Sequence, residues 1–300
     1  MQKGRCEPRS GDQKLKTLLL SLLIASALSA QERTVDPTWL HRYIPASSEA
    51  AGGTGTCRYK PIFGEGDPQN RSLRTVARFG ELAIDAGGNC QSVFYDHQEE
   101  IYFVLEGNAI LHHADQTYRM RMNDFTYLAP GVKHFITNSS QQPLRVLVMG
   151  FKIPAKTPVV GVSPSPRIVN LDDVREETVT GHPTSVLYKL LLGPRTATRD
   201  AIDQAYVVTS FFWMDFAPGG TNFPHHHEAA EEIYLVTDGE GQMVAGGGLD
   251  GIEGRYPAKA GDAYYFRPNC TVGFYNQNKP NDKAHILAVR ARIPPPDNED

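Results

Sequence analysis

The sequence predicts an all-β protein built from two tandem domains of the same architecture. Segments such as Val207–Phe216 are rich in β-branched and aromatic residues and stop at a Pro-Gly turn signal, which is typical of strands. Helix signals are weak, and only Val169–Glu177 offers a short candidate. The pattern Glu-Glu-Ile-Tyr-x-Val-x-x-Gly occurs at residues 99–107 and again at 231–239. A repeat with this spacing of 132 residues indicates a duplicated domain and not a solenoid unit.

The repeat extends over most of the chain with small changes in spacing. Three further pairs match: Tyr59-Lys60 with Tyr188-Lys189, Gly87-Gly88 with Gly219-Gly220, and Ile153-Pro154 with Ile293-Pro294. Their offsets grow from 129 to 140, which indicates one architecture with loop insertions. We therefore expect domains at residues 57–155 and 180–295, joined by a linker at 156–179. Residues 31–56 are expected to form an irregular arm that packs on the first domain.

The first thirty residues have the layout of a secretory signal peptide. Lys14 and Lys16 precede an apolar run from Leu18 to Ala27, and small residues follow up to Ala30. The run is too short to span a membrane. We predict that residues 1–30 are removed by cleavage after Ala30, which gives a secreted or periplasmic protein without a membrane segment in its mature form. A buried N-terminal helix is the alternative.

The charge of the chain argues against nucleic acid as a partner. The formal net charge is −4, and it becomes −7 without residues 1–30, because these carry five basic and two acidic residues. Proteins that bind nucleic acid or anionic membranes usually carry clusters of Lys and Arg, and this chain has none.

Three cysteines follow the predicted signal peptide, namely Cys57, Cys90 and Cys270. In an exported protein, Cys57 and Cys90 can form a disulfide, since both fall in the first repeat. Three buried thiols are the alternative, and the sequence leaves both open.

Three histidines followed by a glutamate mark the second domain. The spacing is Gly219-x5-His225-x-His227-x4-Glu232-x6-Gly239. Because side chains alternate along a strand, His225 and His227 point to the same side, and a turn brings Glu232 opposite them. Two imidazoles and one carboxylate make a site for a divalent metal. The alternative is a solvated histidine loop beside an ordinary acidic pair.

This spacing resembles the first motif of the cupin superfamily. The resemblance covers residues 57–294 and implies that each domain is a cupin barrel, a jelly roll also described as a double-stranded β-helix. Cupins take a fourth metal ligand, a histidine, from a second motif. In the first barrel that position is His134, whereas in the second barrel it is Val272. The second barrel therefore keeps three of the four ligands.

The first barrel keeps fewer ligands. The positions equivalent to the ligands of the second barrel hold Val93, Tyr95 and Glu100. Glu100 and His134, joined by Tyr95 or by His97 after a β-bulge, form a second, degenerate candidate site. The alternative is a Glu–His ion pair across the barrel lumen, which would satisfy both buried groups. We expect no metal in this barrel.

Three ligands in the second barrel suit one divalent transition metal, which we expect to be Fe, Mn, Ni or Zn. The remaining coordination positions would admit a substrate. Asn269, Tyr275 or Asn276 could donate a hydrogen bond to a metal-bound water, and Val272 leaves room for a larger ligand. Tyr234 is a candidate for contact with the substrate.

The resemblance implies a small-molecule ligand but does not choose the reaction. Dioxygenases, isomerases and lyases are found among cupins, and the intact metal motif favours a metalloenzyme of one of these types working in the second barrel. The alternative is a non-catalytic cupin that binds a small molecule or a sugar, or serves as a storage or scaffold barrel. Two fused barrels allow a monomer, and their edge strands also allow a homodimer.

Overall fold

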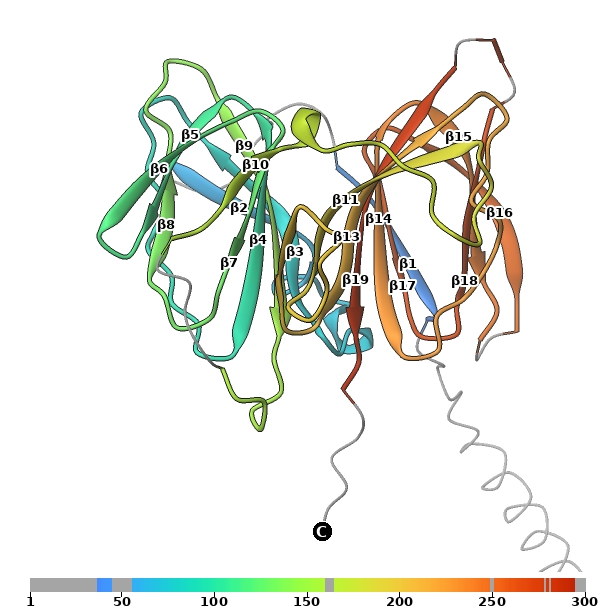
Figure 1. Ribbon diagram of the computed structural model, residues 1–300, viewed down its shortest axis with the longest axis horizontal. Coiled ribbons are helices and arrows are strands. Elements are labelled where there is room, and N and C mark those ends of the chain that lie inside the picture. The colour runs from blue at the N-terminus through green and yellow to red at the C-terminus, as the bar shows by residue number, and fades with distance from the viewer. Residues whose placement is uncertain are drawn as a thin grey trace, which may run out of the picture. The chain divides into compact units, whose positions relative to one another are not determined.

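Strands make up almost all of the regular structure (Figure 1). The computed structural model describes residues 37–44, 56–159, 165–248, 251–277, 279–280 and 282–294. These residues contain nineteen β-strands, two single-turn 3-10 helices and no α-helix, which confirms the all-β fold of two tandem barrels. The predicted signal peptide and most of the predicted arm lie outside the described residues. Among the described residues, no helix is long and apolar enough to cross a membrane.

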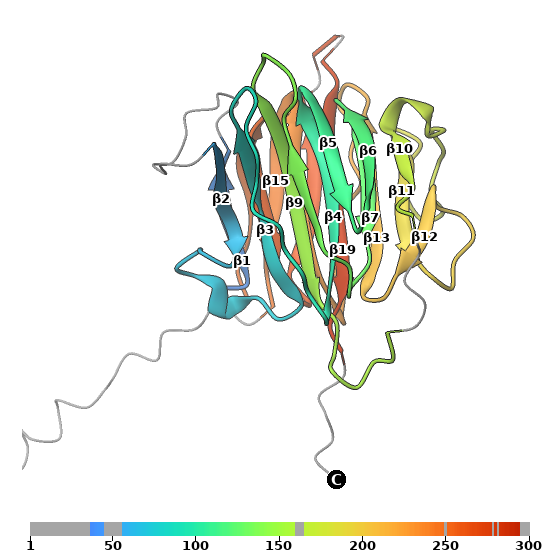
Figure 2. The same ribbon diagram turned by 90° about the vertical axis from the view of Figure 1, so that its left-hand side faces the viewer.

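The first barrel consists of a six-stranded and a three-stranded sheet that face each other (Figure 1). The six-stranded sheet has the order β10-β7-β4-β9-β3-β2, and the three-stranded sheet has the order β6-β5-β8. Figure 2 shows β3, β9 and β4 running side by side along this barrel. The strands are β2 (Cys57–Gly64), β3 (Val76–Ile84), β4 (Gln98–Glu106), β5 (Asn108–His113), β6 (Gln116–Arg121), β7 (Asp124–Leu128), β8 (His134–Thr137), β9 (Leu144–Lys152) and β10 (Ile168–Asn170), with the 3-10 helix η1 (Asn70–Ser72) between β2 and β3.

The second barrel repeats this plan. Its seven-stranded sheet has the order β1-β17-β14-β19-β13-β11-β12, and its three-stranded sheet has the order β16-β15-β18. The strands are β1 (Trp39–Tyr43), β11 (Val186–Pro194), β12 (Ile202–Ala205), β13 (Val208–Phe216), β14 (Ala230–Asp238), β15 (Glu240–Gly246), β16 (Glu253–Lys259), β17 (Asp262–Phe266), β18 (Thr271–Asn276) and β19 (Ala284–Arg292). In the two barrels Glu100 and Glu232 occupy the same register, opposite Gly150 of β9 and Arg290 of β19.

Each barrel receives one strand from the segment that precedes the other barrel. β10 comes before the second barrel but pairs with β7 of the first, and β1 comes before the first barrel but pairs with β17 of the second. The arm was expected to be irregular and to pack on the first domain, but β1 is a strand of the second barrel, and Arg42 of this strand reaches Asp67 and Gln69 of the first. The physical reason is that β17 would otherwise be an open sheet edge, which an added strand closes.

The segment predicted as a linker also contains structure. β10 and the 3-10 helix η2 (Leu171–Asp173) stand where the sequence offered its one short helix candidate, so no α-helix forms there. Asn170 explains the boundary, because its side-chain oxygen accepts a hydrogen bond from the backbone of Asp172 and its amide donates to Asp124 of β7.

Two buried glutamates join the barrels, which belong to one compact unit. Glu231 accepts hydrogen bonds from the backbone N–H groups of residues 74, 75 and 76 and from Tyr265. Glu99 accepts the equivalent bonds from the N–H groups of residues 206, 207 and 208 and from Tyr127. Each carboxylate thus belongs to one barrel and binds the start of a strand in the other. Glu231 therefore serves the interface between the barrels, although it is next to the candidate ligand Glu232 in the sequence.

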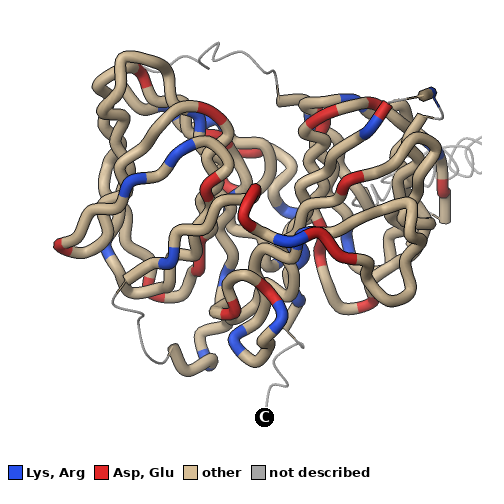
Figure 3. Tube along the Cα trace, turned by 45° about the horizontal axis from the view of Figure 1, so that its top comes forward, with Lys and Arg blue, Asp and Glu red and all other residues tan. Residues whose placement is uncertain are grey.

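Apolar packing supports the same interface. One buried cluster contains residues of both large sheets, and Phe211 of the second barrel packs edge-on against Phe103 and Phe125 of the first. Two further buried clusters fill the barrel lumens, one in the second barrel and one in the first. Acidic and basic residues are interspersed along the described chain (Figure 3).

Cys57 of β2 and Cys90 form a disulfide, which was one of the two arrangements that the sequence left open. Cys270 is a buried thiol in the second barrel.

Candidate metal centre

The segment between β13 and β14 positions the two histidines. His225 pairs with Val272 of β18 through two backbone hydrogen bonds of 2.8 and 2.9 Å. The carbonyl of His227 accepts a bond of 2.8 Å from the backbone N–H of Asn269, so the segment is held at both histidines. Glu232 follows in β14, where its carboxylate is buried.

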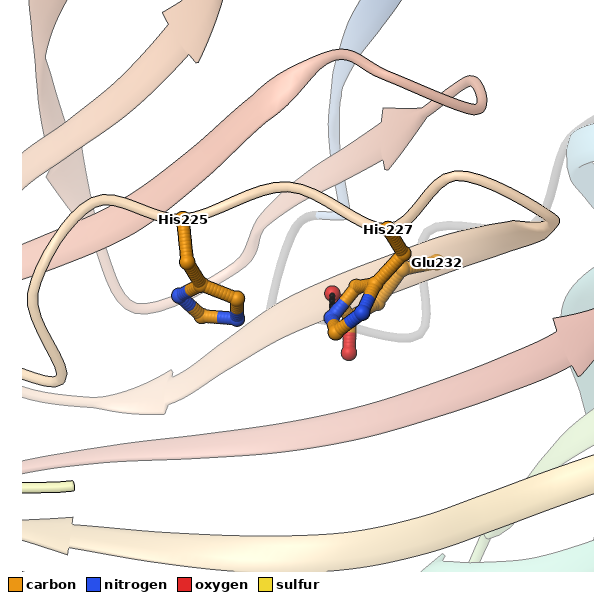
Figure 4. Close-up of side chains that lie close together, drawn as sticks. All are labelled: His225, His227 and Glu232. Carbon is orange, nitrogen blue, oxygen red and sulfur yellow. Dashed lines mark ion pairs between the residues drawn. The ribbon is translucent and has the colours of Figure 1, made fainter. Parts of the chain in front are cut away.

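The three side chains converge on one point, as Figure 4 shows. Their ligand atoms all lie within 4.8 Å of one another, and Nε2 of His227 lies 3.3 Å from a carboxylate oxygen of Glu232. Among the described residues, no other group of three His, Cys, Asp or Glu side chains is this close. The Nδ1–H of His225 donates to the carbonyl of Phe223 at 2.8 Å, which leaves its Nε2 available as a ligand.

The ionisation of the groups suits a cation. Burial lowers the pKa of His225, so its imidazole is neutral, as a metal ligand must be. Burial opposes ionisation of Glu232, but the neighbouring His227 and the charge of Arg290 outweigh it, and the pKa of Glu232 lies below its usual range. The buried Oε2 of Glu232 lies 3.3 Å from Nε2 of His227 and makes no hydrogen bond of normal geometry among the described residues. A buried anionic oxygen without a hydrogen bond is costly, and a metal ion between it and the imidazoles would satisfy it. The residues therefore fit a divalent metal.

Arg290 is a functional candidate that the sequence interpretation missed. Its Nη1 lies 3.1 Å from Nε2 of His227, and its Nε donates to Thr209 at 3.3 Å. A sequence signal was available, because alternation along β19 places Arg290 on the same lumen-facing side as the buried Ile286 and Ala288.

The site opens into a small cavity of about 60 Å³. Tyr234 lines it, and burial raises the pKa of this tyrosine strongly, so its hydroxyl stays protonated while its oxygen accepts a 3.0 Å bond from Asn222. Tyr188 also lines the cavity, and its buried hydroxyl has no partner among the described residues. The lining further includes His182, Arg199, Ser210 and Phe212.

Four other residues considered from sequence lie elsewhere. Asn269 is exposed, and the Asn276 amide donates to the backbone carbonyls of residues 216, 217 and 282. The ring of Tyr275 lies 4.0 Å below the guanidinium of Arg255, outside the cavity lining. Val272 stands beside His225 in the ladder. Asn269, Tyr275 and Asn276 therefore do not reach the site as the sequence suggested, because turn formation and strand packing engage them.

The first barrel gathers a different set around Glu100. One oxygen of Glu100 accepts a short hydrogen bond from Arg78, and the other lies 2.6 Å from Nε2 of His134. The guanidinium of Arg78 also lies 4.0 Å above the ring of Tyr95. His97 is exposed and takes no part in this cluster. The Glu–His pair that was the alternative from sequence is present, with Arg78 as a third member.

Comparison with known proteins agrees with this architecture. A family model described as the cupin domain matches residues 80–150 and 212–290. The chain belongs to the cupin family. No curated protein is similar enough in sequence to count as a match.

Solved structures share the two-barrel fold at low sequence identity. A Lactobacillus farciminis oxalate decarboxylase in complex with formate is 13% identical, with a TM-score of 0.61 over 85% of this chain and 86% of the other. The E. coli protein Ylba is 13% identical, with a TM-score of 0.61 over 89% and 96% of the two chains. Procruciferin, an 11S globulin from Brassica napus, is 12% identical, with a TM-score of 0.61 over 86% and 85%. Such likeness defines the fold of this cupin but not its activity.

Proposed function

We propose that the second barrel binds one divalent transition metal through His225, His227 and Glu232 and acts on a small acid anion. The observation that carries the proposal is the convergence of two imidazoles on a buried carboxylate oxygen of Glu232 that makes no hydrogen bond among the described residues, with all ligand atoms within 4.8 Å. Three protein ligands leave coordination positions open to a substrate. When bound, the metal would supply a Lewis acid that polarises a substrate oxygen.

The charge of the cavity supports an anionic substrate. Arg290 and Arg199 line it, and Glu232 is its one acidic residue. A bound metal would add further positive charge to this cavity, and an anionic substrate would balance that charge. Arg290 and a metal would compete for the same lone pair, on Nε2 of His227. Metal binding would therefore release the guanidinium, which could then hold a substrate carboxylate through two hydrogen bonds. The volume of about 60 Å³ restricts this substrate to a few non-hydrogen atoms.

Two tyrosines support a reaction with proton transfer. The Tyr234 oxygen already accepts a hydrogen bond from Asn222, so its O–H can donate into the cavity. The hydroxyl of Tyr188 is free to do the same. Protonated donors of this kind serve a lyase or an isomerase directly. Among the three reaction types considered, these tyrosine hydroxyls favour an isomerase or a lyase over a dioxygenase.

Metal content tests the first part. Purified wild-type protein reconstituted with Fe, Mn, Ni or Zn should hold about one ion per chain by elemental analysis, and His227→Ala should lose it. His226→Ala is the matched control, since His226 lies between the two ligands but is exposed. Equal metal in both variants would contradict the ligand assignment. A chain that takes up no metal would favour the alternative, a non-catalytic cupin that binds a small molecule, for which the Arg290–His227 contact is the supporting observation.

Binding of oxalate and formate tests the anion. Two of the similar structures are oxalate decarboxylases, one of them with formate, which makes these anions convenient probes. Arg290→Gln should weaken oxalate binding to the metal-loaded protein by about ten- to a hundredfold, the effect of losing a charged hydrogen bond, and should leave the metal in place. Unchanged oxalate binding in Arg290→Gln would remove the argument for an acid anion.

We also propose that the protein is exported. The layout of residues 1–30 motivates this proposal, and the Cys57–Cys90 disulfide supports it, since disulfides persist in oxidising compartments. N-terminal sequencing of protein from native cells should begin near Gln31. Protein that retains residues 1–30 in the cytoplasm would contradict export.

A further inference from the structure

The cavity beside Glu100 in the first barrel has a volume of about 630 Å³, against about 60 Å³ for the cavity beside Glu232 in the second. It falls within the usual range for small-molecule sites, roughly 300 to 1,000 Å³. Its walls are mostly apolar, with Leu82, Val93, Ile136 and Val148 beside tyrosine rings, and the Cys57–Cys90 disulfide lies in its lining. This cavity plays no part in the proposed metal chemistry.

The two buried charges of this cavity, on Arg78 and Glu100, neutralise each other. Arg78 donates to Glu100 and to Gln98, and Glu65 approaches it at 3.3 Å with a carboxylate that is 71% exposed. His134 contacts the second oxygen of Glu100 at 2.6 Å. Both oxygens of Glu100 are therefore engaged, and a metal ion has no ligand set here. A charged ligand would find no unpaired opposite charge, so the cavity favours an uncharged one.

Tyr59 offers a polar group to a ligand in this cavity. The hydroxyl of Tyr59 is buried and has no hydrogen-bond partner among the described residues. Burial raises its pKa well above the usual range, so it stays a neutral O–H that can donate. Tyr188, its counterpart in the repeat, leaves its hydroxyl unpaired in the cavity of the second barrel. Because the equivalent tyrosine hydroxyl lacks a hydrogen-bond partner in both barrels, it indicates a ligand contact in each.

We infer that the first barrel is a metal-independent binding site for an uncharged, mostly apolar ring compound with one oxygen that accepts a hydrogen bond from Tyr59. The apolar walls and the rings of Tyr59, Tyr95 and Tyr102 would pack against the ring of the ligand. A sugar fits less well, because many of its hydroxyls would face the apolar walls.

Binding of p-cresol, followed by ligand-observed NMR and calorimetry on the full chain, tests this inference. The wild-type protein should bind p-cresol equally with and without a metal chelator, and more tightly than benzoate or glucose. Tyr59→Phe should weaken p-cresol binding by about three- to tenfold, the effect of one neutral hydrogen bond. The matched control is Tyr188→Phe, which removes the equivalent hydroxyl of the second barrel and should leave p-cresol binding unchanged.

The outcomes separate this inference from the proposed function. Loss of p-cresol binding on chelation, or in Tyr188→Phe but not in Tyr59→Phe, would assign the ligand to the second barrel and overturn the inference. Preference for benzoate or glucose would overturn the ligand class, and no binding at millimolar p-cresol would overturn the site. Failure of metal binding in the second barrel leaves all these results unaffected.

Discussion

The two barrels keep the same glutamate but exchange the residues around it. In the ladder between β3 and β9 of the first barrel, Arg78 stands opposite Gly150. In the equivalent ladder of the second barrel, Ser210 of β13 stands opposite Arg290 of β19. The arginine thus lies on β3 in the first barrel and on β19 in the second, and in both ladders it stands opposite a small residue. Space explains the pairing, because a Cβ on Gly150 would lie 2.9 Å from Cγ of Arg78.

A histidine and a valine are exchanged in the same way. Val93 pairs with His134 in the first barrel, and His225 pairs with Val272 in the second. The exchange decides what the glutamate does. In the first barrel, arginine and histidine engage both oxygens of Glu100, whereas in the second, one oxygen of Glu232 makes no hydrogen bond among the described residues. Protein groups thus occupy the first glutamate fully, and the second keeps an oxygen that a metal can bind.

The largest effect should come from the buried glutamates that join the barrels. Glu99→Ala and Glu231→Ala each leave three backbone N–H groups without their acceptor. We expect each to lower the free energy of unfolding by about 3 to 6 kcal/mol, and both by similar amounts, in urea denaturation. Glu228→Ala is the control, since Glu228 is exposed. A large cost in only one variant would show that the two halves of the interface are not equivalent.

The exchanged arginines should differ in their contribution to stability. The side chains of Arg78 and Glu100 are 7% and 2% exposed, so Arg78→Met leaves a buried charge and should cost about 3 kcal/mol. Arg290 is only partly buried, and Arg290→Met should cost about 1 kcal/mol. Urea denaturation of the metal-free variants measures both. Equal costs would mean that the second barrel also depends on its arginine for stability.

Much of this comparison could be predicted from the sequence. The spacing of the repeat predicted two domains of one architecture, and the resemblance to cupins implied that each is a barrel. Strand alternation predicted that His225, His227 and Glu232 face one point, which is where the structure places them. Local periodicity carries that information because it acts within one or two strands. The equivalence of Glu100 and Glu232 also followed from the repeat.

The missing parts depend on contacts between distant segments. The strand Trp39–Tyr43 lies outside the repeat, and only the open edge of β17 determines where it pairs. Glu231 is next to a proposed ligand in the sequence, but alternation turns it toward the other barrel. Alternation along β19 could have placed Arg290 on the lumen side. That Arg290 and Arg78 take equivalent places on neighbouring strands could not be recognised before the register of the two ladders was known.

The exchanged histidine predicts a gain of metal affinity. Val272→His should add the fourth ligand to the second barrel and tighten metal binding by about tenfold, near 1.4 kcal/mol. Activity should fall, because the new ligand closes a coordination position that the substrate needs. Competition with a fluorescent chelator measures the affinity. The reverse change, Val93→His, should give no second metal, since Arg78 and His134 already engage Glu100. Two metal ions per chain in that variant would contradict the comparison.

The smallest effect concerns Asn269, which the sequence suggested as a partner for a metal-bound water. Its φ of 63° lies in the left-handed region, as does the φ of 78° at Gly131, its counterpart in the first barrel. Both residues donate a backbone hydrogen bond to the segment opposite, at His227 and Tyr95. Asn269 therefore acts through its backbone, and its side chain is exposed. Asn269→Gly should change stability by less than about 0.5 kcal/mol, whereas Asn269→Ala should cost about 1 kcal/mol, because alanine tolerates positive φ poorly. Metal affinity should be the same in both variants as in the wild type. If Asn269→Gly instead weakens metal binding by tenfold or more at unchanged stability, the amide reaches the metal site and the turn is more than a backbone support.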